Sequence, residues 1–117
     1  MGQLRVEKVQ ELIKQELSKI ILTELKDPRI GFVTVTNVNV TGDLRSAKVY
    51  LSLMGSDDQK TATWTGLQNA LGYLRSEIGK RIRLRFTPEL SLHLDDSLNY
   101  SARIQELLLK IKHEEDN

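Results

Sequence analysis

The chain has 117 residues but no cysteine, only two prolines, and few aromatic side chains (two Phe, three Tyr and one Trp). Without cysteine there is no disulfide framework, thiol nucleophile or cysteine metal site, which suits a reducing cytosol. The longest apolar run has three residues, as at Ile20–Leu22, far too few to span a bilayer. The N-terminal residues lead directly into an amphipathic pattern that contains acids, so no signal peptide is expected. We therefore expect a cytoplasmic protein made of one domain, residues 1–117, with a frayed tail at 113–117.

The shortage of aromatic residues also argues against a platform on which single-stranded bases stack. Trp64 and Phe86 are in phase with neighbouring apolar residues, so both are predicted to lie in the core. Tyr50 and Tyr73 are the two aromatic residues left as candidates for stacking. Nor does the chain contain a glycine-rich phosphate loop of the P-loop or Rossmann type.

Positive charge is concentrated in one segment. Residues 75–85 contain five Lys/Arg and one Glu, a local charge of +4, whereas the whole chain carries a formal charge of only +1. Such a cluster is typical of a surface that meets phosphate groups, and equally of a solvated helix end followed by an edge strand. The predicted RNA-contacting residues are its five cations, namely Arg75, Lys80, Arg81, Arg83 and Arg85.

The first half of the chain predicts a helix and a β-hairpin. Apolar residues recur every three or four positions from about Leu4 to Leu25, and Asp27-Pro28 ends this helix. A strand follows over residues 31–40, with a bulge near Thr36-Asn37 because its apolar residues change parity there. Turn residues at 41–43 precede a second, cleanly alternating strand over residues 47–53.

The second half predicts a kinked helix, a third strand and a last helix. Ser56 can cap a helical pattern that contains three glycines, which favours a break at Ala70-Leu71-Gly72. The third strand covers residues 90–94, and Ser97 can cap a final helix that reaches Ile111. The long connection between the second and third strands permits a parallel crossover. We expect an α+β fold in which helices cover one face of a three-stranded mixed sheet.

This arrangement resembles the ribosome-binding factor A family, which has a type II KH-like fold. The resemblance covers nearly the whole chain and depends on short segments in a fixed order. These are Lys26-Asp27-Pro28-Arg29, Ala47-Lys48-Val49-Tyr50, Ala70-Leu71-Gly72-Tyr73-Leu74-Arg75, Arg83-Leu84-Arg85, Pro88-Glu89-Leu90 and Asp95-Asp96-Ser97.

The resemblance also assigns a role to the break between the helices. Most KH domains clamp nucleic acid with a GxxG loop, and this chain has no two glycines three residues apart. In the family an AxG sequence makes an interhelical kink instead, and Ala70 and Gly72 fit that pattern. Leu92 stands where the family usually has an aromatic residue.

The resemblance implies a bacterial assembly factor. Such a factor binds the immature small (30S) ribosomal subunit, contacts 16S rRNA, assists late maturation and 5′-end processing of that RNA, and matters for growth in the cold. No cofactor, metal, membrane or small-molecule substrate is implied, and the free protein is expected to be a monomer. The alternative is a KH-like module that acts mainly through a protein partner, with the basic segment merely solvated.

An enzymatic reading rests on Ser91, His93 and Asp95, which share one face of the predicted third strand. Side chains two residues apart on a strand are separated by about 6.6–6.8 Å, which we expect to exceed direct hydrogen-bond reach. With no coherent set of nucleophile, base and orienting group, the sequence favours a binding protein over an enzyme.

Overall fold

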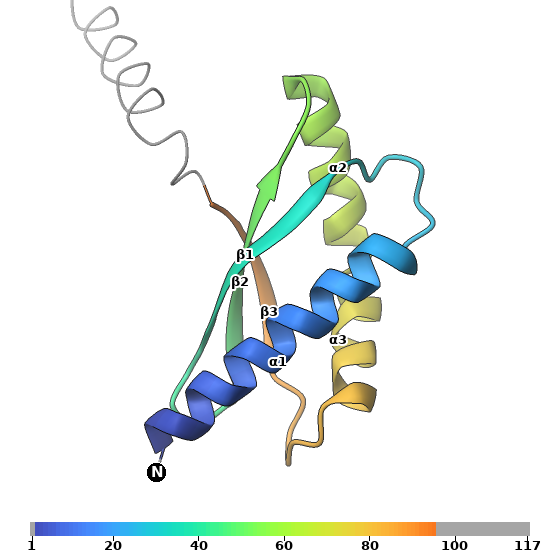
Figure 1. Ribbon diagram of the computed structural model, residues 1–117. Coiled ribbons are helices and arrows are strands. Elements are labelled where there is room, and N and C mark those ends of the chain that lie inside the picture. The colour runs from blue at the N-terminus through green and yellow to red at the C-terminus, as the bar shows by residue number, and fades with distance from the viewer. Residues whose placement is uncertain (1, 96–117) are drawn as a thin grey trace, which may run out of the picture.

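The structure is a computed structural model that describes residues 2–95 (Figure 1). The fold is α+β, as predicted, and its elements follow the predicted order as far as the third strand. The predicted final helix and the tail at 113–117 lie outside the described residues. The elements are α1 (Gly2–Thr23), β1 (Val33–Val40), β2 (Ser46–Leu53), α2 (Asp57–Asn69), α3 (Leu71–Arg81) and β3 (Glu89–Leu94).

Helix α1 presents one apolar stripe to the core. The stripe residues recur every three or four positions and are all buried, namely Val9, Ile13, Leu17, Ile20 and Ile21. The helix ends at Thr23, four residues before Asp27, which together with Pro28 was predicted to stop it. The spacing of the apolar residues therefore determines which face of α1 meets the sheet.

The three strands form one mixed sheet in the order β1-β2-β3. Strands β1 and β2 are antiparallel, and their register shifts between Val35 and Asn37, which confirms the predicted bulge at Thr36. The shift lets Val35 and Val38 both face the core although their spacing is odd. Strand β3 pairs in parallel with β2, from Ser46 opposite Glu89 to Leu51 opposite Leu94.

Helices cover one face of the sheet. In Figure 1, α1 crosses in front of the strands and α3 lies beside it. The buried cluster joins residues from all three strands to α1 and α3, with Leu51, Leu74 and Ile78 fully enclosed. Among residues 2–95, no helix is both long and apolar enough to cross a membrane.

The predicted kink separates α2 from α3. Ser56 begins α2 with a capping box, because its side chain accepts from the Gln59 N–H while the Gln59 side chain accepts from the Ser56 N–H. The helix ends at Asn69, and Ala70, at φ −88° and ψ 0°, joins it to α3. The Ala70-Leu71-Gly72 segment is therefore the interhelical kink, as predicted.

Two of the three glycines in this region serve close packing rather than the kink. A Cβ on Gly66 would lie 2.8 Å from the Ile30 side chain, and one on Gly79 would lie 2.6 Å from Thr87 Oγ1. A Cβ on Gly72 would meet no atom within 4 Å. A Cβ at 66 or 79 would therefore force a neighbouring side chain to move, whereas position 72 has open space.

Candidate RNA interface

The basic segment divides into two halves with different structures. Arg75, Lys80 and Arg81 belong to α3, whereas Arg83 and Arg85 lie in the connection between α3 and β3. The helix ends at Arg81, and Ile82 already has an extended backbone (φ −117°, ψ 122°). We call residues 75–81 the helical half and residues 82–85 the extended half.

Arg75 fastens the helical half to the strand that follows. Its guanidinium donates to the backbone carbonyls of Thr87 and Pro88 at 3.1 and 3.2 Å. It also forms a 3.0 Å ion pair with Glu89 at the start of β3. These contacts hold the α3–β3 connection against the helix, so Arg75 has a structural role in this fold.

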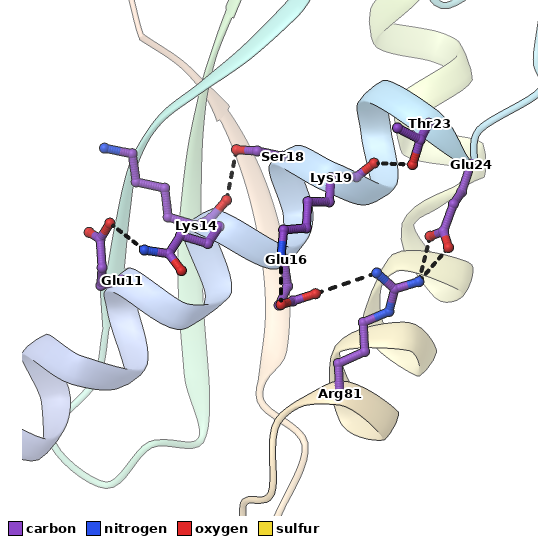
Figure 2. Close-up of polar contacts among 9 residues, drawn as sticks. Glu11, Lys14, Glu16, Ser18, Lys19, Thr23, Glu24 and Arg81 are labelled. Carbon is purple, nitrogen blue, oxygen red and sulfur yellow. Dashed lines mark hydrogen bonds and ion pairs between the residues drawn. The ribbon is translucent and has the colours of Figure 1, made fainter.

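Arg81 joins α3 to α1. Figure 2 shows its guanidinium reaching across to two carboxylates on the α1 side. Arg81 Nη2 lies 2.5 Å from Glu24 Oε1, and Nη1 lies 3.4 Å from Glu16 Oε2. The hydrogen bond to Glu24 is the main reason why the pKa of Arg81 is raised. Two acids surround this cation, which leaves little of its charge for a phosphate group.

The three remaining predicted residues are exposed. Within residues 2–95, neither Lys80 nor Arg83 nor Arg85 forms an ion pair. Arg85 instead lies near the ring of Phe86, with Cζ 5.5 Å from the ring centroid. Of the five predicted cations, these three are therefore the ones placed to meet an external anion.

The structure adds cations that the sequence reading missed. Arg5 and Lys8 of α1 line one recess with Arg83, and Arg5 lines an adjoining recess with Arg45 and Arg85. We call these five residues (Arg5, Lys8, Arg45, Arg83 and Arg85) the basic end. Figure 1 shows why they meet: the first turns of α1, the β1–β2 turn and the α3–β3 connection lie at the same end of the molecule.

One signal for the missed residues was present in the sequence. Arg5 and Lys8 are three residues apart in a helix, so they share a face, and Val9 places that face beside the core. Arg45 gave no such signal, because its position depends on the β1–β2 turn reaching the α3–β3 connection. Only the tertiary fold brings these segments together.

The kink lies away from the basic end. Helix α3 has eleven residues, and at 1.5 Å per residue its two ends are about 16 Å apart. Ala70 stands at one end of α3 and the extended half begins at the other. The predicted site is thus two separate features, a kink and a basic end, rather than one continuous patch.

The prediction that Phe86 lies in the core is wrong. Its side chain is 48% exposed, and the Cζ atoms of Arg45 and Arg85 lie 4.6 and 5.5 Å from its ring centroid. Trp64 is half-buried and packs against the core, in accord with its apolar phase. The alternation of Ile82, Leu84 and Phe86 was misleading because these residues belong to no strand, so no strand pairing holds the Phe86 side chain against the core.

We expected Ser91, His93 and Asp95 to be too far apart for direct hydrogen bonds, and for one pair this is wrong. Ser91 Oγ and His93 Nε2 lie 2.9 Å apart, within hydrogen-bond distance. The Asp95 carboxylate accepts from Thr36 Oγ1, the hydroxyl of the bulge residue in β1. The Ser91 and His93 side chains therefore meet, which the rise of a strand alone did not predict, whereas the Asp95 carboxylate contacts a residue of another strand. In residues 2–95, no cluster of three or more His, Cys, Asp or Glu could hold a metal ion.

Comparison with known proteins agrees with this architecture. The family model described as "Ribosome-binding factor A" matches residues 5–108. A protein from Halothermothrix orenii with the same description is 49% identical over 117 residues, which is all of this chain and 96% of that protein.

Solved structures show the same fold. The crystal structure of ribosome-binding factor A from Thermus thermophilus matches with a TM-score of 0.65 and 25% identity, over 76% of this chain and 94% of that one. The solution structure of a Thermotoga maritima protein, described as a putative ribosome binding factor A, matches with a TM-score of 0.59 and 32% identity, over 72% and 84% of the two chains. A homology model of the T. thermophilus protein, fitted into a cryo-EM map of its complex with the 30S subunit, matches with a TM-score of 0.61 and 24% identity, over 74% and 91%. The chain belongs to the ribosome-binding factor A family.

Proposed function

We propose that this protein binds the immature small ribosomal subunit and contacts 16S rRNA mainly through the basic end. The observation that carries the proposal is the convergence of five cations from three separate segments on one end of the molecule. Cations spaced over a surface give affinity and orientation on a phosphate backbone without reading its sequence. A related protein has been placed in a complex with the 30S subunit, which supports the same partner for this chain.

The proposed action is to favour one arrangement of folded rRNA. A binding protein shifts an RNA equilibrium only by its difference in affinity for the alternative arrangements. We infer that the basic end binds the arrangement found late in maturation, and that the factor leaves when the site changes. Assistance to 5′-end processing of 16S rRNA, a role in the cytoplasm and importance for growth in the cold belong to this proposal, on the strength of family membership.

The two structural arginines have a different part in the proposed function. Arg75 and Arg81 fix the position of α3, and through it the start of the extended half. They are positioning residues, whereas Arg83 and Arg85 are the proposed contacts, together with Lys80 on the last turn of α3. The kink at Ala70 and Gly72 sets the direction of α3 and so shapes the surface without carrying charge.

Co-sedimentation with purified small subunits tests the proposal. The Arg83→Glu/Arg85→Glu variant should bind at least about tenfold more weakly than wild type, because each lost phosphate contact removes counterion release. A matched control, Lys26→Glu/Lys48→Glu, makes the same charge change at two exposed positions outside the basic end. Wild-type binding should weaken steeply as salt rises, and circular dichroism should show that all three proteins fold.

A second candidate function, binding through a protein partner, is favoured by one specific observation. Phe32 is 81% exposed and Met54 is 66% exposed, and both line a recess of about 480 Å³ with Pro28. If both charge variants bind subunits like wild type and salt has little effect, this surface becomes the better candidate and the rRNA contact at the basic end is wrong.

A further inference from the structure

Among residues 2–95, Phe86 is the aromatic residue that lines the recesses of the basic end, and it is half exposed beside arginines. The Arg45 guanidinium lies over its ring at 4.6 Å, and that of Arg85 lies at 5.5 Å. An exposed aromatic ring gives up the favourable burial of a large apolar surface. Cation–π contact returns part of this energy and keeps both guanidinium groups next to the ring.

The turn that carries Arg45 is held firmly. The Asp43 carboxylate accepts from Thr41 Oγ1 at 2.7 Å and from the Arg45 N–H at 3.1 Å. These hydrogen bonds, Thr41 first, lower the pKa of Asp43. The Arg45 carbonyl accepts from the Glu89 N–H at 2.8 Å, which ties the turn to β3.

Leu44 lies between these residues with φ 61°, in the left-handed region that leucine rarely adopts. An unfavourable backbone conformation persists where surrounding contacts impose it, and such positions occur often at ligand sites. Here the side chain of Leu44 packs against the core cluster while the next residue, Arg45, is directed to Phe86. The strained residue therefore anchors the turn and presents its cation at the same time.

These groups line a recess of about 300 Å³. Its walls combine three arginines with one acid and three apolar side chains, namely Arg5, Arg45, Arg85, Asp43, Leu44, Leu84 and Phe86. The three cations and Asp43 give the recess a formal charge of +2. An aromatic ring next to guanidinium groups that outnumber the single carboxylate matches the two parts of a nucleotide, its base and its phosphate.

We propose that this recess holds one unpaired nucleotide of the RNA, with its base stacked in the Phe86–Arg45 cluster and its phosphate beside Arg5 and Arg85. The base either extends the stack on the outer face of the Arg45 guanidinium or replaces that group on the ring. A base within a duplex offers no free face, so the site selects a nucleotide in a loop, bulge or end. The inference rests on the proposed function, and it adds to it a preference for unpaired RNA.

Fluorescence anisotropy with two labelled probes tests this preference on the full chain. The probes are a short single-stranded oligouridylate and a fully paired RNA duplex of the same length. Phe86→Leu should weaken binding of the single strand about five- to tenfold, since one base–aromatic stack is worth at least that much. Its affinity for the duplex should be unchanged. Phe32→Leu is the matched control, because Phe32 is an exposed phenylalanine outside the recess and should change neither affinity.

If circular dichroism shows that Phe86→Leu is poorly folded, two further variants test the inference. Phe86→Trp retains a stacking ring and should bind the single strand at least as well as wild type, whereas Arg45→Gln should reproduce the loss. Equal binding by wild type, Phe86→Leu and Arg45→Gln, or no binding of the single strand by wild type, would overturn the inference. Co-sedimentation separates the two proposals: subunit binding that is lost in Arg83→Glu/Arg85→Glu but unaffected by Phe86→Leu would leave the proposed function standing and remove the nucleotide site.

Discussion

The helical and extended halves of the basic segment carry similar residues but use them differently. In the helical half, Arg75 and Arg81 donate to carboxylates and carbonyls of other elements. In the extended half, Arg83 and Arg85 have no acidic partner within residues 2–95. The number of cations in a segment therefore overstates the charge that a ligand meets, and the difference is set by which acids the fold brings near.

Secondary structure explains this division. Side chains on α3 lie beside α1 and the α3–β3 connection, where Glu24 and Glu89 are within reach. After Arg81 the chain leaves the helix and follows the edge of the core, so alternate side chains turn outward. The two arginines of the helical half thus form structural ion pairs, whereas Lys80 on its last turn and the arginines of the extended half stay accessible.

The largest expected difference between the two halves is in how much their inward-facing apolar side chains contribute to the free energy of unfolding. Ile78 in the helical half is fully buried, and Ile78→Ala should lower the free energy of unfolding by about 2–5 kcal/mol, because it leaves a cavity. Leu84 in the extended half is only half-buried, so Leu84→Ala should lower it by less than about 2 kcal/mol. Urea unfolding measures both. Equal losses would mean that the extended half contributes to the core as much as the helix does.

Substituting the two glycines of α3, Gly72 and Gly79, should change the free energy of unfolding by smaller amounts and in opposite directions. Gly72→Ala should raise the free energy of unfolding by about 0.4–1 kcal/mol, because the position has open space and alanine restricts the unfolded chain. Gly79→Ala should lower it, since the new Cβ would lie 2.6 Å from Thr87 Oγ1 and push the α3–β3 connection away. Thermal unfolding of the two variants should move in opposite directions. A stabilised Gly79→Ala would show that the connection is not held closely against α3.

The smallest expected change in stability concerns the ion pair between Arg29 and Asp27, which are only two residues apart in the sequence. The hydrogen bond from the Arg29 side chain is the main cause that lowers the pKa of Asp27 from 3.8 to about 2. A carboxylate with a lowered pKa stabilises the folded state above pH 3.8, and this contribution is lost as the pH falls toward 2. The stability difference between wild type and Asp27→Asn should therefore shrink over that pH range. A difference that stays constant from about pH 5 to about pH 2 would contradict the ion pair.

Much of the fold could be predicted from the sequence because local patterns determine it. The apolar stripe of α1, the parity change at Thr36 and the glycines around Ala70 each report a local constraint, and the helix, the bulge and the kink all occur. The family could likewise be recognised from short segments in order, and the comparisons confirm it.

The site was harder to predict because it depends on contacts between distant segments. Arg81 reads as a free cation until α1 places Glu16 and Glu24 beside it. The alternation at 82–86 suggests that Phe86 is a core residue, but the chain here lies between α3 and β3 and joins the sheet only at Glu89. Arg45 gains its place only from the β1–β2 turn. The charge and the hydrophobic periodicity of the sequence do not show which distant segments lie side by side in the fold.

The most direct test compares two double variants by the same two measurements. Arg83→Gln/Arg85→Gln should keep the wild-type thermal stability and lose most of the binding to small subunits in co-sedimentation. Arg75→Gln/Arg81→Gln removes the same number of charges and should lower the thermal stability while the protein that remains folded still binds. If instead the first variant binds like wild type and the second, though folded, does not, then the helical half carries the RNA contact and the proposed division of the basic segment is wrong.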